Sequence, residues 1–250
     1  MRMQIDEEMH LPSRDWDTRP ESRSGRASSR LLFPNTSTRR ILSVYRTNPW
    51  MELGARDIAE LAGRMTPSVA HRSITRLADY GILSKSEPAV PTAWPRYTLN
   101  MDSPTTMKLL EALEVDHRLE FLRRKRALVR PLRRLEDELF RSTSFSLLGM
   151  YLFGSWARNE EGSESDLDLL LVFPPGCMPQ RDEIRAAERD LRATLNPSLI
   201  PVDPVQVRDG FARHKPVYED IWRDRVILSG ESLFWQLIRS IPQSQGGGLG

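Results

Sequence analysis

The sequence predicts an α+β protein with a helical front part, a helical linker and a mixed sheet flanked by helices. Three observations lead to this prediction. Short helical patterns fill the front of the chain, two longer apolar stripes of helical period follow, and apolar strands alternate with an amphipathic helix in the back part. A chain of 250 residues exceeds one average domain, so we expect two small domains.

The boundaries follow from changes in composition and periodicity. Residues 1–36 are rich in Arg, Ser, Pro and Asp and show little periodicity, so we expect them to be disordered. The Gln/Ser/Gly-rich end of the chain gives the same expectation. The remaining divisions are a compact helical domain over 37–100, a helical linker over 101–141, a second domain over 142–235 and a mostly disordered tail over 236–250.

Charge is unevenly distributed, although the formal net charge is only +2. Basic residues outnumber acidic ones from Thr38 to Arg141, and acidic ones prevail from Ser142 onward, which indicates that the front half faces nucleic acid. Cys177 is the only cysteine, which excludes an internal disulfide framework and a cysteine-based zinc cluster. No long apolar run or signal peptide is apparent, so we expect a cytoplasmic protein without a membrane partner.

The compact helical domain can be followed in order. A first helix begins near Thr38 and ends at Asn48-Pro49, and a short helix over 55–62 is closed by Gly63. Thr66-Pro67 then provides a capping hydroxyl followed by proline at the first helical position, which predicts a third helix ending at Gly81. Residues 82–85 and 96–99 read as a two-stranded hairpin.

Three helices followed by a hairpin resemble a winged helix-turn-helix domain. This resemblance implies that the third helix enters the major groove of DNA and that the hairpin contacts the phosphate backbone. The implied DNA-binding residues are His71, Arg72, Thr75 and Arg76 on the helix, and Lys85 and Arg96 on the wing. Two alternatives stay open, because such a face can simply be solvated, and many winged helices bind protein or form dimers.

The linker shows two apolar helical stripes, with a predicted break near Pro131. The basic run Arg123-Arg124-Lys125-Arg126 lies between them. We interpret this region as a helix that joins the domains or as a pairing surface for a homodimer. The basic run is a solvated face in the simplest interpretation, with nucleic acid as the alternative.

The second domain contains the residue pattern with the clearest chemistry. An apolar strand over 144–153 runs into Gly154-Ser155 at the start of a helix. A second strand carries Asp166 and Asp168, which point to the same side because side chains alternate along a strand. Two adjacent carboxylates repel each other and need a cation, and Mg²⁺ or Mn²⁺ with substrate phosphates is the natural guest. Gly154 allows a phosphate to approach the backbone, and Ser155 offers a hydroxyl.

A later strand is predicted over 199–207, and it contains Asp203. An amphipathic helix over 181–195 precedes this strand. Pro201 and Pro204 lack a backbone donor, so they confine the strand to a sheet edge or distort it.

This segment resembles the DNA polymerase beta superfamily of nucleotidyltransferases, and within it the minimal branch. The motif is carried by Gly154, Ser155, Arg158, Ser165, Asp166 and Asp168. The resemblance implies a nucleoside triphosphate substrate, with ATP the expected one. Its phosphates would lie at Gly154, Ser155, Arg158 and Ser165, and its metal at Asp166 and Asp168. The family has a third carboxylate on a later strand, and Asp203 falls at that place, so the resemblance implies that Asp203 is the third metal ligand or the general base. Asn159 stands where such sequences usually have glycine.

The sequence therefore predicts a metal-dependent nucleotidyltransferase with a DNA-binding module. The acceptor of the nucleotide is open between a protein, a tRNA and a small molecule. A second hypothesis is a transcriptional regulator whose back domain senses nucleotide or binds a partner, since a fold can persist without its activity. A third is a component of a toxin–antitoxin module.

Overall fold

The computed structural model describes residues 36–63, 65–87, 94–143, 147–162, 164–192 and 195–241. Most of the two predicted tails, residues 1–35 and 242–250, lies outside this part of the chain. Residues 236–239 belong to a helix instead, and Ile238 is fully buried there. The second domain thus extends beyond the predicted end at residue 235.

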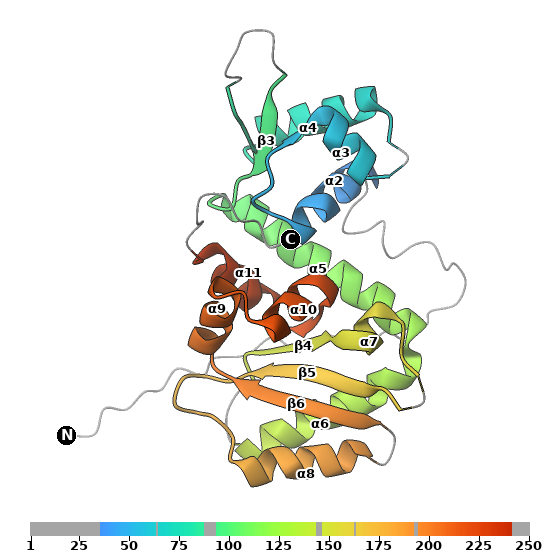
Figure 1. Ribbon diagram of the computed structural model, residues 1–250, viewed down its shortest axis with the longest axis vertical. Coiled ribbons are helices and arrows are strands. Elements are labelled where there is room, and N and C mark those ends of the chain that lie inside the picture. Colours follow the sequence, from blue (N-terminus) through green and yellow to red (C-terminus); the bar gives the residue numbers. More distant parts are fainter. Residues whose placement is uncertain are drawn as a thin grey trace, which may run out of the picture.

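The front of the described chain folds into three helices and a small antiparallel sheet (Figure 1). The helices are α2 (Thr36–Thr47), α3 (Ala55–Leu61) and α4 (Pro67–Asp79), and the strands are β1 (Leu53–Gly54), β2 (Leu83–Lys85) and β3 (Arg96–Leu99). The expected hairpin of β2 and β3 is present. β1 adds a third strand, because Leu53 pairs with Tyr97 on the other side of β3.

The ends of α4 follow from the local sequence. The Thr66 side chain accepts a hydrogen bond from the Val69 amide at 3.4 Å, and Pro67 occupies the first turn, where no amide hydrogen is needed. The chain leaves the helix through Gly81, whose φ of 67° lies in the left-handed region. The cap and the glycine therefore set the length of this helix.

Two long helices follow, α5 (Pro104–Arg124) and α6 (Arg126–Thr143). The chain turns at Lys125, and Pro131 lies inside α6, so the predicted break near Pro131 is wrong. Turning at Lys125 lets α6 fold back and bury a row of leucines, namely Leu128, Leu132, Leu135 and Leu139. Because these leucines pack into the core of the second domain, α6 belongs to that domain and not to a linker. No helix among the described residues is long and apolar enough to cross a membrane.

A four-stranded mixed sheet forms the centre of the second domain. Its strands are β4 (Gly149–Phe153), β5 (Asp166–Val172), β6 (Asn196–Val202) and β7 (Val226–Ser229), in the order β6-β5-β4-β7. β5 and β6 are parallel and are joined through α8 (Arg181–Arg192), and the other two pairs are antiparallel. A mixed sheet with flanking helices confirms the α+β prediction for this part of the chain.

Helices cover both faces of this sheet (Figure 1). α6 and α8 pack on one face, against Leu152 and Leu169 among others. The opposite face, which includes Tyr151 and Leu170, is covered by α9 (Pro204–Ala212), α10 (Pro216–Asp224) and α11 (Glu231–Arg239). The hydrophobic core on that side continues into the front domain, so the two domains share one core.

Polar contacts also join the two domains, beside α5. The Trp222 indole donates a hydrogen bond to the carbonyl of Thr47 at 3.0 Å, and its ring stacks on Trp50 with centroids 5.7 Å apart. The Arg225 guanidinium donates to the carbonyl of Arg46 at 2.8 Å. The end of α2 is thereby fixed to the second domain at the junction of α10 and β7.

Candidate active site

The end of strand β4 lies directly beside Asp168. Phe153 pairs with Asp168 across the β4–β5 ladder, and Gly154 follows with a φ of 73°. A Cβ atom on Gly154 would lie 2.5 Å from Oδ2 of Asp168. Glycine is required here for two reasons, the left-handed backbone and the close approach of the carboxylate. The structure thus brings together the two predicted residues Gly154 and Asp168.

The short helix α7 (Gly154–Arg158) continues from this point and carries the partly exposed Ser155. It ends at Asn159, which adopts a left-handed conformation with φ 61° and ψ 35°. Asparagine is one of the residues that tolerate this conformation at a helix end. Asn159 therefore makes the helix end for which glycine was expected.

Asp166 and Asp168 share one side of β5, while Leu167 and Leu169 are fully buried on the other. Burial raises the pKa of Asp168, a hydrogen bond from Ser198 lowers it, and the charge of Asp166 raises it again, with a net upward shift. A cation between the two carboxylates would relieve their repulsion. The pair therefore has the chemistry of a cation ligand, and cation binding by it stays a prediction.

The neighbouring strand β6 places two uncharged polar side chains next to this pair. In the parallel register, Asn196 pairs with Asp166 and Ser198 pairs with Asp168. The Asn196 amide donates a hydrogen bond to Oδ1 of Asp166. Across the described segments of the chain, no group of three or more His, Cys, Asp or Glu side chains is arranged to hold a metal ion.

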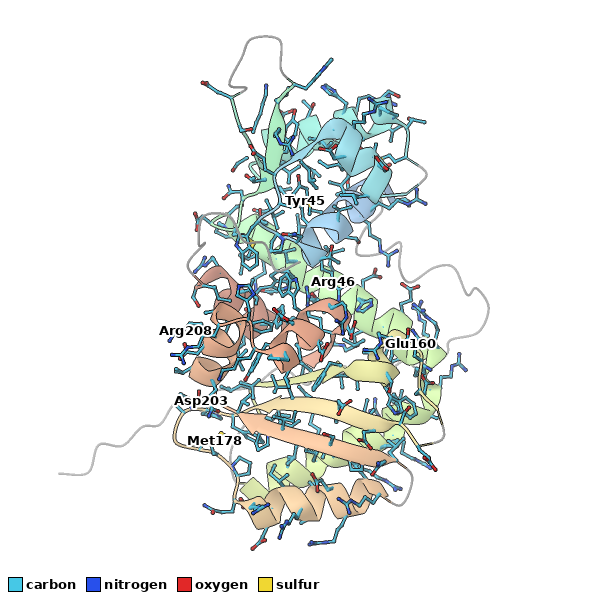
Figure 2. All side chains as sticks on the ribbon, in the orientation of Figure 1. Tyr45, Arg46, Glu160, Met178, Asp203 and Arg208 are labelled. Atoms are coloured by element: carbon cyan, nitrogen blue, oxygen red, sulfur yellow. The ribbon has the colours of Figure 1, made fainter. Side chains whose placement is uncertain are left out.

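Asp203 lies away from the pair. β6 ends at Val202, and Asp203 is the N-cap of α9, where its carboxylate accepts a hydrogen bond from the Gln206 amide at 2.8 Å. The strand from Ser198 to Asp203 spans about 16 Å, since each extended residue adds about 3.3 Å. Figure 2 shows Asp203 and Glu160, the residue after Asn159, at opposite ends of the sheet. The structure does not bring Asp203 to the predicted metal site.

The prolines near Asp203 have separate roles. Pro201 lies in β6, which is an edge strand, as its missing backbone donor predicts. Pro204 occupies the first turn of α9, a favourable position for proline. Pro204 therefore starts a helix, and the expectation that it distorts a strand is wrong.

Arg158 and Ser165 stabilise the loops around the site in this structure. Arg158 forms ion pairs with Glu160 at 2.7 Å and with the nearly buried Asp224 at 2.6 Å, which join α7 to α10. The Ser165 hydroxyl accepts a hydrogen bond from the Gly162 amide at 2.8 Å and closes the turn before β5. Both predicted phosphate ligands are thus engaged in intramolecular contacts beside the pair.

Asn196, Ser198 and Asp220 are site residues that sequence reasoning missed. The charge of Asp220, on α10, contributes to the raised pKa of Asp168, and its carboxylate is held by Arg223 at 2.5 Å. The start of β6 could have been found from its pairing with β5, because a parallel strand beside Asp-x-Asp presents alternate residues to the same side. Asp220 has no comparable signal, since α10 reaches the sheet only through the tertiary fold.

The predicted DNA-contacting residues divide into two groups. His71, Arg72, Thr75 and Arg76 are all exposed on α4, and Lys85 is exposed on β2. Arg96 is also exposed, but its guanidinium donates to the carbonyl of Glu52 at 2.6 Å and ties β3 to the segment before β1. Arg96 therefore has a structural role within the front domain, whereas the side chains on α4 face solvent.

Substituting Gly154 tests the close approach to Asp168. Gly154→Ala is expected to cost about 1–3 kcal/mol from backbone strain and to displace the Asp168 carboxylate. Gly176→Ala is the matched control, because Gly176 has a similar φ of 77° but an added Cβ there would meet no atom within 4 Å. Both variants should lose stability in urea unfolding, and only Gly154→Ala should also weaken Mn²⁺ binding measured by calorimetry. Equal Mn²⁺ affinity in the two variants would contradict the role of Gly154.

Comparison with known proteins agrees with this geometry. Residues 132–225 match the family model of the nucleotidyltransferase domain, a segment that contains β4, α7, β5 and β6 with Gly154, Asp166 and Asp168. Searches among curated proteins and among solved structures found no match. The matched segment begins within α6 and ends at Arg225, which agrees with the assignment of α6 to the second domain. Residues 132–225 of this chain are therefore similar in sequence to the nucleotidyltransferase domain.

Proposed function

We propose that the protein transfers a nucleoside monophosphate from a nucleoside triphosphate to an acceptor hydroxyl, in a metal-dependent reaction. The observation that supports this proposal is the contact between Gly154 and Asp168 in a nucleotidyltransferase domain. It places a glycine backbone, where a phosphate can approach, next to the carboxylate pair. ATP is the proposed donor, and the front domain is proposed to be a winged helix that binds DNA.

The residues near the pair fit a hard divalent cation. Asp166 and Asp168 offer carboxylate oxygens, and the Ser198 hydroxyl and the Asn196 amide adjoin them. Mg²⁺ binds through one or two carboxylates together with substrate phosphates and water, so two carboxylates suffice for it. When bound, the ion supplies charge stabilisation to the transferring phosphoryl group.

The proposed reaction forms one bond and breaks one. The acceptor oxygen bonds to the α-phosphorus, the bond from that phosphorus to the bridging oxygen breaks, and pyrophosphate leaves. Asp166 and Asp168 would hold the cation, which would neutralise phosphate charge, and Gly154 and Ser155 would contact the phosphates. The hydroxyl proton passes to water, because β6 presents Ser198 and not a carboxylate next to Asp168.

A transfer assay tests the proposal. The full chain is incubated with each α-labelled triphosphate, Mg²⁺ or Mn²⁺, and cell lysate separated into protein, RNA and small-molecule fractions. Covalent label in one fraction, dependent on the metal and accompanied by pyrophosphate release, is the expected result. Absence of label in every fraction with every triphosphate would overturn the assignment of transfer.

One observation favours a second candidate, a regulator whose back domain binds nucleotide without turnover. The third carboxylate that the resemblance implied is absent from β6, where Ser198 and Asn196 lie instead. Nucleotide binding needs the phosphate contacts and the metal, whereas transfer also needs the acceptor to lose a proton. Nucleotide binding in calorimetry, together with a negative transfer assay, would select this candidate.

The DNA-binding proposal rests on the exposed face of α4. The double substitution Arg72→Gln/Arg76→Gln is expected to weaken duplex DNA binding and to reduce the salt dependence of log K by about 0.9 for each lost phosphate contact. Arg185→Gln/Arg189→Gln on α8 is the matched control, since these arginines are exposed at the opposite end of the molecule (Figure 1). Equal affinity and equal salt slope for both double variants, measured by fluorescence anisotropy, would argue against DNA recognition by α4.

A further inference from the structure

The corner between α5 and α6 concentrates positive charge. Residues 123–134 read Arg-Arg-Lys-Arg-Ala-Leu-Val-Arg-Pro-Leu-Arg-Arg and contain no acidic residue. Within α6, Arg126, Arg130 and Arg134 follow each other at intervals of four residues, so they share one face of the helix. All three are exposed, opposite the buried leucines of the same helix. We call Arg126, Arg130 and Arg134 the basic ridge.

The described part of the chain does not neutralise the basic ridge. Among the described residues, none of its three guanidinium groups forms an ion pair or a hydrogen bond, in contrast with neighbouring Arg124, which pairs with Glu120 at 3.0 Å. Arg133, on the same helix, has its Nε atom buried without a hydrogen-bond acceptor in the described structure. On α8, by contrast, an arginine lies next to an acid, since Arg192 is 3.5 Å from Glu188. The ridge therefore carries positive charge that an external anion could balance.

The ridge begins near α7, on the face of the sheet opposite the Asp166 and Asp168 side chains. Lys125, directly before Arg126, lies 5.7 Å from the centroid of the Trp156 ring and forms an ion pair with Glu161. Trp156 belongs to α7, one residue after Ser155, and Figure 1 shows α7 next to the end of α5. A polyanion lying along the ridge would thus reach the side of α7 that packs toward α6.

The geometry of the ridge suits a phosphodiester backbone. Four helical residues rise about 6 Å, so the three guanidinium groups form a row with a regular spacing of that size. Arginine binds phosphate oxygens through two parallel hydrogen bonds, and it keeps its charge at every physiological pH. A row of such groups recognises the backbone of a nucleic acid without reading its sequence.

We propose that the basic ridge binds the phosphodiester backbone of a nucleic acid. This proposal rests on the ridge alone and does not depend on the proposed transfer function. It distinguishes two nucleic-acid surfaces on one chain, α4 in the front domain and the ridge in the second domain. Figure 1 shows α4 and α6 at opposite ends of the molecule.

The test measures binding in the full chain carrying Arg72→Gln/Arg76→Gln, so that contacts through α4 are reduced. The probes are a labelled mixed-sequence single-stranded RNA and a labelled DNA duplex of equal length, titrated at several salt concentrations. Adding Arg126→Gln, Arg130→Gln and Arg134→Gln is expected to lower affinity for at least one probe by tenfold or more at low salt. The salt slope for single strands should fall by about 2, since each lost phosphate contact removes about 0.7. The probe that responds shows whether the backbone is RNA or DNA.

Two further variants make the result decisive. Arg181→Gln/Arg185→Gln/Arg189→Gln on α8 removes the same number of charges outside the ridge and should leave affinity unchanged. Replacing the three ridge arginines by lysine keeps the charge and should retain most of the binding. If the ridge and α8 variants bind both probes equally, or if the ridge substitutions change only the oligomeric state in sedimentation, the proposal is wrong. Binding to the ridge with a negative transfer assay would instead refute the transfer function and leave the ridge as a nucleic-acid site.

Discussion

Asp168→Asn is expected to lower nucleotidyl transfer by about 10²-fold or more while the fold is retained. The substitution removes one of two carboxylates that face the same side of β5, and with it one of the proposed ligands for the cation. Metal-ion stabilisation of a transferring phosphoryl group is worth several kcal/mol, and about 1.4 kcal/mol corresponds to a tenfold change in rate. Initial rates of label transfer at saturating Mg²⁺ measure the loss, and the melting temperature reports on the fold.

The matched control is Asp203→Asn, which makes the same chemical change at the other end of the sheet. Asparagine is as good an N-cap as aspartate, so this variant should keep both α9 and the activity. Asp166→Asn should behave like Asp168→Asn, because the two side chains share one site. If Asp203→Asn lost activity as severely as Asp168→Asn, the site would include Asp203, in conflict with its position at the start of α9. Full activity in both Asp166→Asn and Asp168→Asn would exclude the pair from catalysis.

The part of this site on β4, α7 and β5 can be predicted from sequence, whereas the part on β6 cannot. Gly154, Asp166 and Asp168 lie within one β-loop-β unit, so their proximity follows from local rules of strand alternation and pairing. Which residue of β6 lies beside Asp168 depends on where β6 begins. The apolar run that starts at Leu199 indicates a start that is too late, because Asn196 and Ser198 are already paired with β5. Asp203 follows the last strand residue, and its fit to a capping box with Gln206 identifies it as a helix start.

The fold shows the same division between local and tertiary information. Thr66, Pro67 and Gly81 mark the limits of α4 correctly because caps act within a few residues. Pro131 is a misleading signal for the break between α5 and α6, because the turn at Lys125 is stabilised by packing of the leucines of α6 on the sheet. Similarly, the boundary that composition predicts for the second domain falls inside α11, although Phe234 and Trp235 of that helix are fully buried. Amphipathic helices reveal an apolar face, but the partner of that face is set by the fold.

A second large effect is expected at the junction of the two domains, where Glu114→Gln should destabilise the protein by about 3–5 kcal/mol. Glu114 is fully buried and forms ion pairs with Arg46 at 2.8 Å and with Arg225 at 3.3 Å. Burial alone would raise its pKa, but the two arginines lower it overall, so Glu114 is ionised at neutral pH. His117 does not share the charge, because burial and Arg46 lower its pKa to about 4.

Glutamine keeps the size of the side chain but leaves two guanidinium groups, one of them fully inside the core, without their anion. Arg225 cannot escape to solvent, since it lies 4.4 Å from the Trp222 ring centroid and 4.8 Å from that of Phe234. The matched control is Glu120→Gln, further along α5, whose half-exposed carboxylate pairs with Arg39 and Arg124 and should contribute about 0.2–1 kcal/mol. Urea unfolding monitored by tryptophan fluorescence measures both. Glu114, on α5, connects Arg46 of α2 to Arg225, the residue directly before β7, so its loss should also separate the unfolding of the two domains. A single unfolding transition with the same midpoint as that of Glu120→Gln would show that the shared apolar core joins the domains without this ion pair.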